Sequence, residues 1–417
     1  LHVHSKYSRA CSKALELPAI AKAGEQKGIS IVVTGDFTHP RWFEHLTDVL
    51  VEDRAGIYRL KNNPSPTRFV IGTEVACIYK HAGAVRRVHL LLFAPTLEVA
   101  GKINQALAER GCNLKADGRP ILGISAKDLL KLMLDIDERC VMIPAHAWTP
   151  WFAVFGSKSG YNSLEECFEE LTPRIHAIET GLSSDPVMNR RLSMLDGITL
   201  ISNSDAHSLE NLAREANVFT FDRAEDITYD SLFAAIQTGD KKRLAYTIEF
   251  YPEEGKYHAD GHAACLVSLE PVETKRENGL CPKCGKPLTI GVLHRVDDLA
   301  DRDVKNIPAE TFVPHRYIVP LREIIAQVIG VKTASKKVVA EYERLTTRVG
   351  SEFFILLHAP LEMILKETSF PGIATAIGRM RAGTVKVTPG YDGVFGVIEV
   401  VDKKDSGAKL RQRELFI

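Results

Sequence analysis

The fold of this chain is constrained most by a series of short apolar runs, several of which end beside a histidine or an acidic residue. The runs are rich in Val, Ile and Leu with little alternation, as in strands that are buried on both faces. Helical patterns separate several of them, over residues 12–28, 97–111 and 125–138. This alternation predicts an α/β fold built on a barrel of about seven parallel strands. The predicted strands are 1–4, 29–35, 68–78, 86–94, 140–145, 175–180 and 198–202.

Histidines and carboxylates stand at or near the ends of these runs. A parallel barrel collects its strand ends at one face, so we expect these side chains to meet there. In His2-Val3-His4, and again in Asp205-Ala206-His207, two donors lie two residues apart and point to the same side of a strand. Imidazole and carboxylate groups are typical ligands of catalytic metals, so the set predicts a metal centre. The set comprises His2, His4, Asp36, His39, Glu74, His89, His146, Asp205 and His207.

A second group of metal-ligand type lies further along the chain. His262 and Cys265 form one pair with two intervening residues, and Cys281 and Cys284 form another within Cys-Pro-Lys-Cys-Gly. Each pair can hold one side of a tetrahedral ion. We expect a zinc ribbon with one structural zinc ion, which would stabilise a segment too short to bury a core of its own. His258 is an alternative to His262 in the first pair.

Length and composition limit the organisation and the partners of the chain. A chain of 417 residues suffices for two or three domains. We predict a barrel over 1–250, a zinc-binding segment over 251–303 and a mostly helical domain over 304–417. The formal charge is zero, so the chain as a whole does not indicate a polyanionic partner.

The cysteines and the apolar runs bear on location. Eight cysteines, three of them clustered at metal-ligand spacing, suit a reducing cytosol, and we expect a cytoplasmic protein. No run approaches the length of a membrane span, so we expect no membrane partner. Because the chain opens on Leu1 within an expected strand, we also expect a few residues to precede it.

An aromatic-rich loop follows His146 directly. Aromatic rings interleaved with polar groups suit stacking on an unstacked base and contact with its phosphate. A loop packed as a lid over the barrel is the alternative. Near the start of the chain, basic and hydroxyl side chains could hold phosphate oxygens, although a solvated turn accounts for them equally well. The candidate substrate-binding residues are Lys6, Ser8, Arg9, Trp148, Trp151, Phe152, Phe155, Lys158, Ser159 and Tyr161.

The strand-end motifs resemble those of the polymerase and histidinol phosphatase (PHP) superfamily, whose members hold two or three ions in a distorted (β/α)7 barrel. The resemblance implies that one ion is bound by the catalytic residues His2, His4, Glu74 and Asp205. Glu74 would bridge to a second ion, held by His89 and His146. Asp36 and His207 would contribute to a third, with His39 as a further candidate. The chain departs from the fullest pattern at this third site, because Asp36 stands where a histidine is common. Zn, Mn, Mg and Fe all suit such ligand sets.

The whole chain resembles the endonuclease Q family of prokaryotic DNA-repair nucleases. The resemblance implies metal-dependent nicking on the 5′ side of deaminated bases (uracil, hypoxanthine, xanthine) and of abasic sites, leaving a 3′-hydroxyl and a 5′-phosphate. Damaged DNA, double- or single-stranded, would be the partner, and the C-terminal domain would contact DNA and is a candidate contact for a replication clamp. Two alternatives stay open, a PHP-type phosphoesterase for a small phosphomonoester and a non-catalytic DNA-binding module. The motifs that carry the resemblance are 2–10, 35–40, 148–161, 182–186, 202–207, 281–285 and 389–393.

Overall fold

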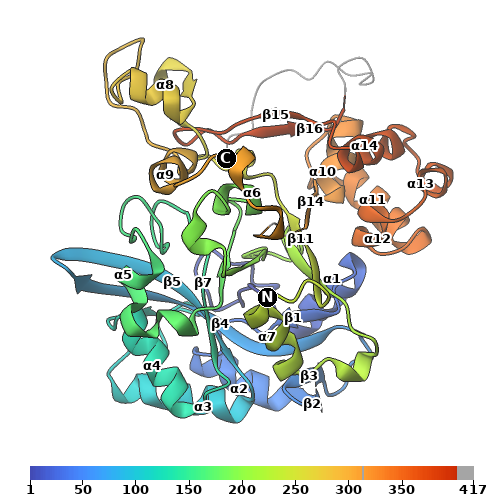
Figure 1. Ribbon diagram of the computed structural model, residues 1–417. Coiled ribbons are helices and arrows are strands. Elements are labelled where there is room, and N and C mark those ends of the chain that lie inside the picture. Colours follow the sequence, from blue (N-terminus) through green and yellow to red (C-terminus); the bar gives the residue numbers. More distant parts are fainter. Residues whose placement is uncertain (312–313, 402–417) are drawn as a thin grey trace.

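The computed structural model describes residues 1–311 and 314–401 and has a mixed α/β fold (Figure 1). Six of the predicted apolar runs form strands, and the first, over 1–4, makes a single parallel bridge from Val3 to Ala206. Each strand lies within the range that the apolar pattern predicts or extends it by a few residues. The six are β1 (Ile31–Val33), β4 (Arg68–His81), β5 (Ala84–Ala94), β7 (Val141–Pro144), β8 (Ala177–Glu179) and β9 (Thr199–Ile201).

These strands follow one another around a ring. β1 pairs with β4, β4 with β5, and β5 with β7. The segment after β7 bonds to β8 through Ala147 N–H and the Glu179 carbonyl at 3.0 Å, and β8 pairs with β9. The bridge between Val3 and Ala206 then joins β9 to the start of the chain. Gly35, just past β1, lies so close to the Val3 carbonyl oxygen that a Cβ there would be 2.4 Å from it. The ends of distant strands therefore meet at one face.

The strand directions differ from the predicted all-parallel barrel. β4 and β5 form a long antiparallel hairpin, and β5 is antiparallel to β7 as well. The hairpin turns at Ala82 and Gly83, with φ of 48° and 77°. Positive φ at both central residues matches the twist of hairpin strands, so no helix is needed between them. Three further strands extend this sheet, β2 (Leu50–Arg54), β3 (Ile57–Leu60) and β6 (Ile121–Leu122).

Helices cover the outside of the ring. The predicted helical stretches form α1, α3 and α4, and Ser125 caps α4 by accepting a hydrogen bond from Asp128 N–H. α2, α3 and α4 lie together at the bottom of Figure 1, and the core between helices and strands contains fully buried Trp42, Phe69 and Phe93. The helices are α1 (Leu17–Lys27), α2 (Pro40–Val49), α3 (Leu97–Glu109), α4 (Ala126–Ile136), α5 (Leu164–Phe168), α6 (Pro186–Asn189) and α7 (Tyr229–Thr238).

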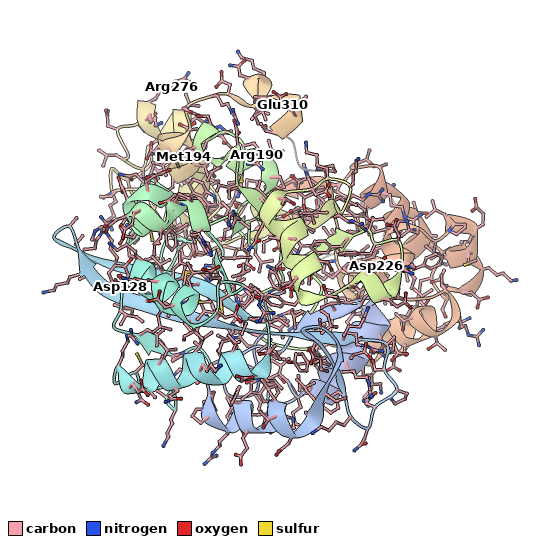
Figure 2. The ribbon with its side chains drawn as sticks, turned by 60° about the horizontal axis from the view of Figure 1, so that its bottom comes forward. Asp128, Arg190, Met194, Asp226, Arg276 and Glu310 are labelled. Atoms are coloured by element: carbon pink, nitrogen blue, oxygen red, sulfur yellow. The ribbon has the colours of Figure 1, made fainter. Side chains whose placement is uncertain are left out.

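The predicted zinc-binding segment, residues 251–303, has only a small core of its own, formed by Val267, Cys281 and Leu288. It rests on the barrel through side chains near α6. Arg190, labelled in Figure 2, is buried at this junction, and its carbonyl oxygen accepts a hydrogen bond from Arg302 Nε at 2.7 Å. The elements of this segment are β12 (Asp260–His262), β13 (Val267–Leu269), α8 (Pro271–Arg276) and α9 (Val292–Leu299).

The C-terminal part forms a second core, which also contains Ile248 and Tyr251. A three-stranded sheet joins it to the barrel, because β14 (His315–Tyr317) pairs with β11 (Leu244–Glu249), and β11 pairs with β10 (Ala216–Phe219). The hairpin of β15 (Lys386–Thr388) and β16 (Val397–Glu399) runs from the helices back towards the zinc-binding segment (Figure 1). The helices are α10 (Leu321–Ile329), α11 (Lys336–Arg348), α12 (Glu352–Leu357), α13 (Leu361–Glu367) and α14 (Gly372–Arg381).

Two stretches of the predicted C-terminal domain, 312–313 and 402–417, lie outside the described residues. Among the described residues, no helix combines the length and the apolar character needed to cross a membrane.

Candidate metal centre

The candidate ligands come from sharp turns at strand ends. Asp36, His146 and Asp205 follow β1, β7 and β9, and all three have left-handed backbones, with φ of 46°, 29° and 43°. Residues other than glycine rarely adopt this conformation, and it concentrates at functional sites. Here it turns three side chains towards the centre of the ring face.

The first cluster brings together side chains from the start of the chain and from the end of the last strand of the ring. His2, His4, Glu74 and Asp205 each offer one donor atom, and these atoms all lie within 4.8 Å of one another. His4 Nε2 lies 3.2 Å from Glu74 Oε2 and 3.1 Å from Asp205 Oδ1. His2 Nε2 lies 3.4 Å and 3.3 Å from the same two oxygens. Two imidazoles and two carboxylates thus converge on one point.

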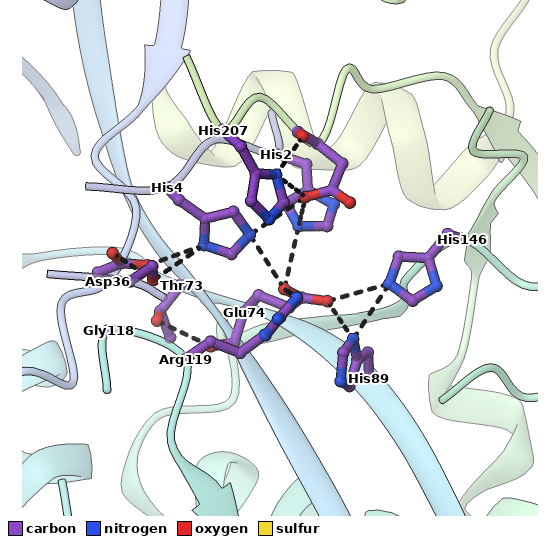
Figure 3. A network of polar contacts seen from close by, with 12 residues as sticks. His2, His4, Asp36, Thr73, Glu74, His89, Gly118, Arg119, His146 and His207 are labelled. Carbon is purple, nitrogen blue, oxygen red and sulfur yellow. Dashed lines mark hydrogen bonds and ion pairs between the residues drawn. The ribbon is translucent and has the colours of Figure 1, made fainter. Parts of the chain in front are cut away.

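The second cluster shares Glu74 with the first. Its other carboxylate oxygen, Oε1, lies 2.7 Å from His89 Nδ1 and 3.1 Å from His146 Nε2. Figure 3 shows Glu74 between the pair His2 and His4 on one side and the pair His89 and His146 on the other. Glu74 thus belongs to both clusters and would offer one carboxylate oxygen to each.

The buried polar atoms of the two clusters are suited to binding cations. His2 Nε2 is buried and has no hydrogen-bond partner, although it points at two carboxylate oxygens. Burial disfavours the charged imidazolium, but Glu179, Asp205 and Glu74 outweigh it and raise the pKa of His2 to about 10. Burial also opposes the charge on Glu74, yet the neighbouring His89, His2 and Arg119 hold its pKa well below the usual range. The site therefore demands positive charge, which divalent ions would supply.

Two residues that support the cluster were missed in the sequence. Glu179, at the end of β8, is fully buried, and its two oxygens lie 3.1 Å from His2 Nδ1. It also accepts a hydrogen bond from His146 N–H at 2.7 Å. The sequence feature that could have identified Glu179 is its position as an acidic residue at the end of an apolar run. Arg119, from a loop without any motif, brings Nη1 to 3.1 Å from Glu74 Oε2 and is partly exposed (Figure 3).

Asp36 belongs to the surroundings of His4. Asp36 Oδ1 lies 3.1 Å from His4 Nδ1, and Oδ2 accepts from the Ser5 N–H, the Ser5 hydroxyl and the Ser8 hydroxyl at 2.7, 2.7 and 2.8 Å. A carboxylate behind an imidazole fixes its orientation and raises its basicity. Asp36 thus holds His4 in the direction of the first cluster.

The other candidates for the third site lie nearby. The His207 ring is 4.7 Å from that of His4, and its Nδ1 lies 2.9 Å from the Asp205 carbonyl oxygen. His39 stacks on the Tyr7 ring at 4.3 Å. Within the described residues, the donor groupings with metal-binding spacing do not include Asp36, His39 or His207.

The predicted zinc ligands also gather. His262, Cys265, Cys281 and Cys284 offer donor atoms within 4.8 Å of one another, so His262 rather than His258 belongs to the group. Although desolvation opposes the thiolate, backbone N–H groups of Lys283 and Cys284 lower the pKa of Cys281 to about 6. A thiolate is the form that binds zinc.

The chain is similar over nearly its whole length to solved structures. The crystal structure of the lesion-specific endonuclease PfuEndoQ from Pyrococcus furiosus matches with a TM-score of 0.84 and 30% identity, covering 98% of this chain and 96% of that one. The chain belongs to the endonuclease Q family. A structure of endonuclease Q with a 27-mer duplex substrate, which has an abasic lesion at the active site, matches with a TM-score of 0.83 and 30% identity, covering 98% of each chain.

Two curated relatives of this chain come from further organisms. Protein YqxK of Bacillus subtilis is 29% identical over 398 residues, which is 93% of each chain. Protein MJ0043 of Methanocaldococcus jannaschii is 29% identical over 264 residues, 62% of this chain but only 32% of that protein. The chain thus matches about a third of MJ0043. The family model of the MJ0043 C-terminal domain matches residues 320–384, which contain α10 to α14.

The aromatic loop of this endonuclease Q chain divides into buried and accessible residues. Trp148, Phe155 and Tyr161 are at most 1% exposed, and Trp148 Nε1 donates to Asn189 Oδ1 at 2.8 Å. These three rings pack in the barrel core and are not available to stack on a base in this conformation. Trp151 is 43% exposed. Fewer residues of this loop can therefore stack on a base than the sequence predicted, because these three buried rings are excluded.

Phe152 links this loop to the metal ligands. Its ring lies 4.7 Å from that of His89, and its carbonyl oxygen accepts from His89 N–H at 3.0 Å. The Arg87 guanidinium lies 6.0 Å from the centre of the Phe152 ring. Of the polar candidates in the loop, Lys158 is exposed, whereas Ser159 is buried and donates to the Arg87 carbonyl.

The three candidates near His4 have different surroundings. The Ser8 hydroxyl is buried and donates to Asp36. Lys6 Nζ lies 2.7 Å from Glu16 Oε1. The Arg9 side chain is 82% exposed, with Nε 3.3 Å from Asp117 Oδ2. Of these three, Arg9 has the side chain most accessible to an incoming phosphate.

Proposed function

We propose that this protein is a metal-dependent DNA-repair endonuclease that nicks on the 5′ side of deaminated bases and abasic sites, leaving a 3′-hydroxyl and a 5′-phosphate. One observation carries the proposal: the match to a lesion-specific endonuclease covers 98% of this chain, including the parts outside the barrel. The two clusters that share Glu74 support the proposal, because metal ions held there would stabilise the negative charge that develops when a phosphodiester is hydrolysed. We further propose a PHP-type barrel over 1–250, a zinc ribbon over 251–303 and a DNA-contacting domain over 304–417.

The chemistry follows from the ligand sets. Divalent ions held here would supply positive charge and Lewis acidity at the scissile phosphate. His2, His4 and Asp205 form one side of the centre, and Glu74 connects it to the other side. The Arg119 guanidinium, partly exposed beside Glu74, can donate to a phosphate oxygen. Glu179 and Asp36 hold the imidazoles of His2 and His4 in their orientations.

The lesion would be recognised with its nucleotide rotated out of the duplex. Opening a damaged or mismatched pair costs less than opening an intact one, which supplies part of the selectivity. Phe152 lies beside His89, and Trp151 precedes Phe152 in the chain, so an extruded base near this loop would leave its phosphate close to the second cluster. The exposed Lys158 and Arg9 are candidates to contact the neighbouring phosphates.

A nicking assay tests this proposal directly. End-labelled duplexes with one central uracil, hypoxanthine or abasic site, and an undamaged duplex, are incubated with the protein and Mg²⁺ or Mn²⁺. We expect a single nick on the 5′ side of each lesion, a product that a polymerase extends, and no nick after chelation. Intact lesion strands in both metals, together with turnover of a free phosphomonoester, would overturn the proposal in favour of a small-molecule phosphoesterase.

Matched histidine variants test the site. His146→Ala removes a ligand of the second cluster, and we expect nicking to fall by at least a hundredfold. His358→Ala removes an exposed histidine of the C-terminal domain, and we expect its activity to equal that of the unaltered protein. Equal nicking by both variants would exclude the second cluster from catalysis.

A further inference from the structure

Two exposed aromatic rings, a half-buried tyrosine and one lysine form a continuous strip on the surface. We call Trp151, Lys256, Tyr257 and Phe395 the aromatic strip. Lys256 Nζ lies 5.7 Å from the ring centres of both Tyr257 and Phe395, and the Tyr257 ring lies 6.1 Å from that of Trp151. Phe395 is 69% exposed and Trp151 is 43% exposed. Rings this accessible are shielded from water only when a partner covers them.

A tightly built turn presents Phe395. The turn 389–396, Pro-Gly-Tyr-Asp-Gly-Val-Phe-Gly, bonds to the segment before Tyr257 through three main-chain N–H groups, those of Gly390, Gly393 and Gly396, at 2.8, 2.9 and 3.1 Å. A Cβ at Gly390 would lie 2.5 Å from the Gly255 carbonyl oxygen, and one at Gly396 would lie 2.0 Å from that of Glu253. The close backbone contacts therefore require glycine at both positions.

The same turn is anchored to the zinc-binding segment. Asp392 accepts from Ala263 N–H at 2.6 Å and from the Thr289 hydroxyl at 2.5 Å. The Tyr391 ring lies against Gly261. Phe395 thus stands out from a turn held on two sides, so inserting its ring into a partner would cost little additional ordering.

The strip is continuous with the metal centre. Trp151 is next in the chain to Phe152, whose ring contacts His89 of the second cluster. Cations accompany the rings along the way, Arg87 beside Phe152 and Lys256 between Tyr257 and Phe395. Alternating rings and cations fit bases and phosphates, whereas a purely apolar patch would fit a protein surface.

We propose that Phe395 is a wedge that inserts into the base stack of a duplex next to the lesion, while Lys256 pairs with the adjacent phosphate and Trp151 contacts the displaced nucleotide. This inference rests on the proposed nuclease function and adds how the duplex is opened. An inserted apolar side chain partly unstacks the neighbouring bases and so favours extrusion of the lesion towards the metal ions. A single-stranded substrate has no stack to open and does not need the wedge.

Comparing duplex and single-stranded substrates tests the wedge. Phe395→Ala should lower kcat/KM for nicking an abasic duplex between about tenfold and a hundredfold, and change it less than threefold for the same single strand. With chelator present, 2-aminopurine next to the lesion should brighten on binding the unaltered protein and brighten less with the variant. Phe395→Trp, which keeps a ring, should retain both signals. Val387→Ala removes another exposed apolar side chain of the same hairpin and should leave both unchanged.

The outcomes separate this inference from the proposed function. If the unaltered protein nicks no lesion in either metal, the proposed function fails whatever Phe395 does. If the unaltered protein nicks the lesion duplex and Phe395→Ala nicks it equally fast, only the wedge is overturned. The aromatic strip would then be a surface for a protein partner. An equal loss on duplex and single strand would also overturn the wedge, because the ring would then act elsewhere.

Discussion

Replacing Glu179 by glutamine tests how the metal centre is held together. Glu179 is not itself an expected metal ligand, but its carboxylate contacts His2 and accepts a hydrogen bond from His146 N–H. Glutamine has nearly the same volume and loses the negative charge. Because Glu179 is the strongest influence that raises the pKa of His2 against burial, the variant should leave His2 a less basic and less well oriented ligand.

The magnitude follows from the hydrogen bonds that glutamine cannot make. The glutamine amide keeps one acceptor oxygen and turns an NH₂ group towards the other donor, so at least one charge-assisted hydrogen bond disappears, worth about 1.5–3 kcal/mol. The loss of such a support costs about 10- to 100-fold in metal affinity. We expect the metal concentration for half-maximal nicking to rise about 30-fold, or about 2 kcal/mol, with the maximal rate within about threefold.

Nicking of an abasic duplex over a range of Mn²⁺ concentrations measures the effect, and calorimetry of metal binding checks it without catalysis. Glu249→Gln is the matched control, because Glu249 is equally buried but bonds to Thr180 and Thr247 instead of to ligands. Burial raises the pKa of Glu249 to about 8, so the group is largely neutral at pH 7 and its amide should change metal dependence little. If the Glu179→Gln curve coincides with that of the unaltered protein, Glu179 does not support the centre.

Three further predictions concern Arg119, the zinc-binding segment and Glu249. Arg119→Ala should lower the single-turnover nicking rate about 100-fold at saturating Mn²⁺, with partial recovery in Arg119→Lys, and a change below twofold would exclude a phosphate contact. Cys281→Ser should remove one zinc ion per chain by metal analysis and make residues 256–300 protease-sensitive, and an unchanged zinc content would refute the ligand set. The pKa of Glu249, raised from 4.5 to about 8, makes the folded state bind its proton more tightly than the unfolded state. Stability should therefore fall as pH rises from about 5 through 8, and Glu249→Gln should flatten the melting temperature over pH 6–9; parallel curves would contradict this.

The local patterns of the chain were readable because they depend on neighbouring residues. Strand periodicity placed His2 beside His4, and the two-residue spacings within the pairs of the zinc-binding segment identified Cys281 and Cys284. The helix that begins after Ser125 was readable from its cap. In each case backbone geometry over a few residues determines which side chains share a face, so one segment of sequence is enough.

The long-range arrangement needed the tertiary structure. His2 and Glu179 are 177 positions apart, and no local pattern relates them. The β4–β5 pair is antiparallel instead of parallel as expected, because a two-residue turn with positive φ at Ala82 and Gly83 reverses the chain directly. The burial of Trp148, away from any base, likewise depends on what packs around the loop.

By itself, then, the sequence determined which residues could bind metal and roughly where the strands and helices lie. Only the tertiary structure decided that Arg119 and Glu179 contact the two clusters that share Glu74, and that Phe395 stands exposed at the end of an aromatic strip. The physical reason is that ligand type and periodicity are properties of short segments. Closure of the ring and burial are set by packing between residues far apart in the chain.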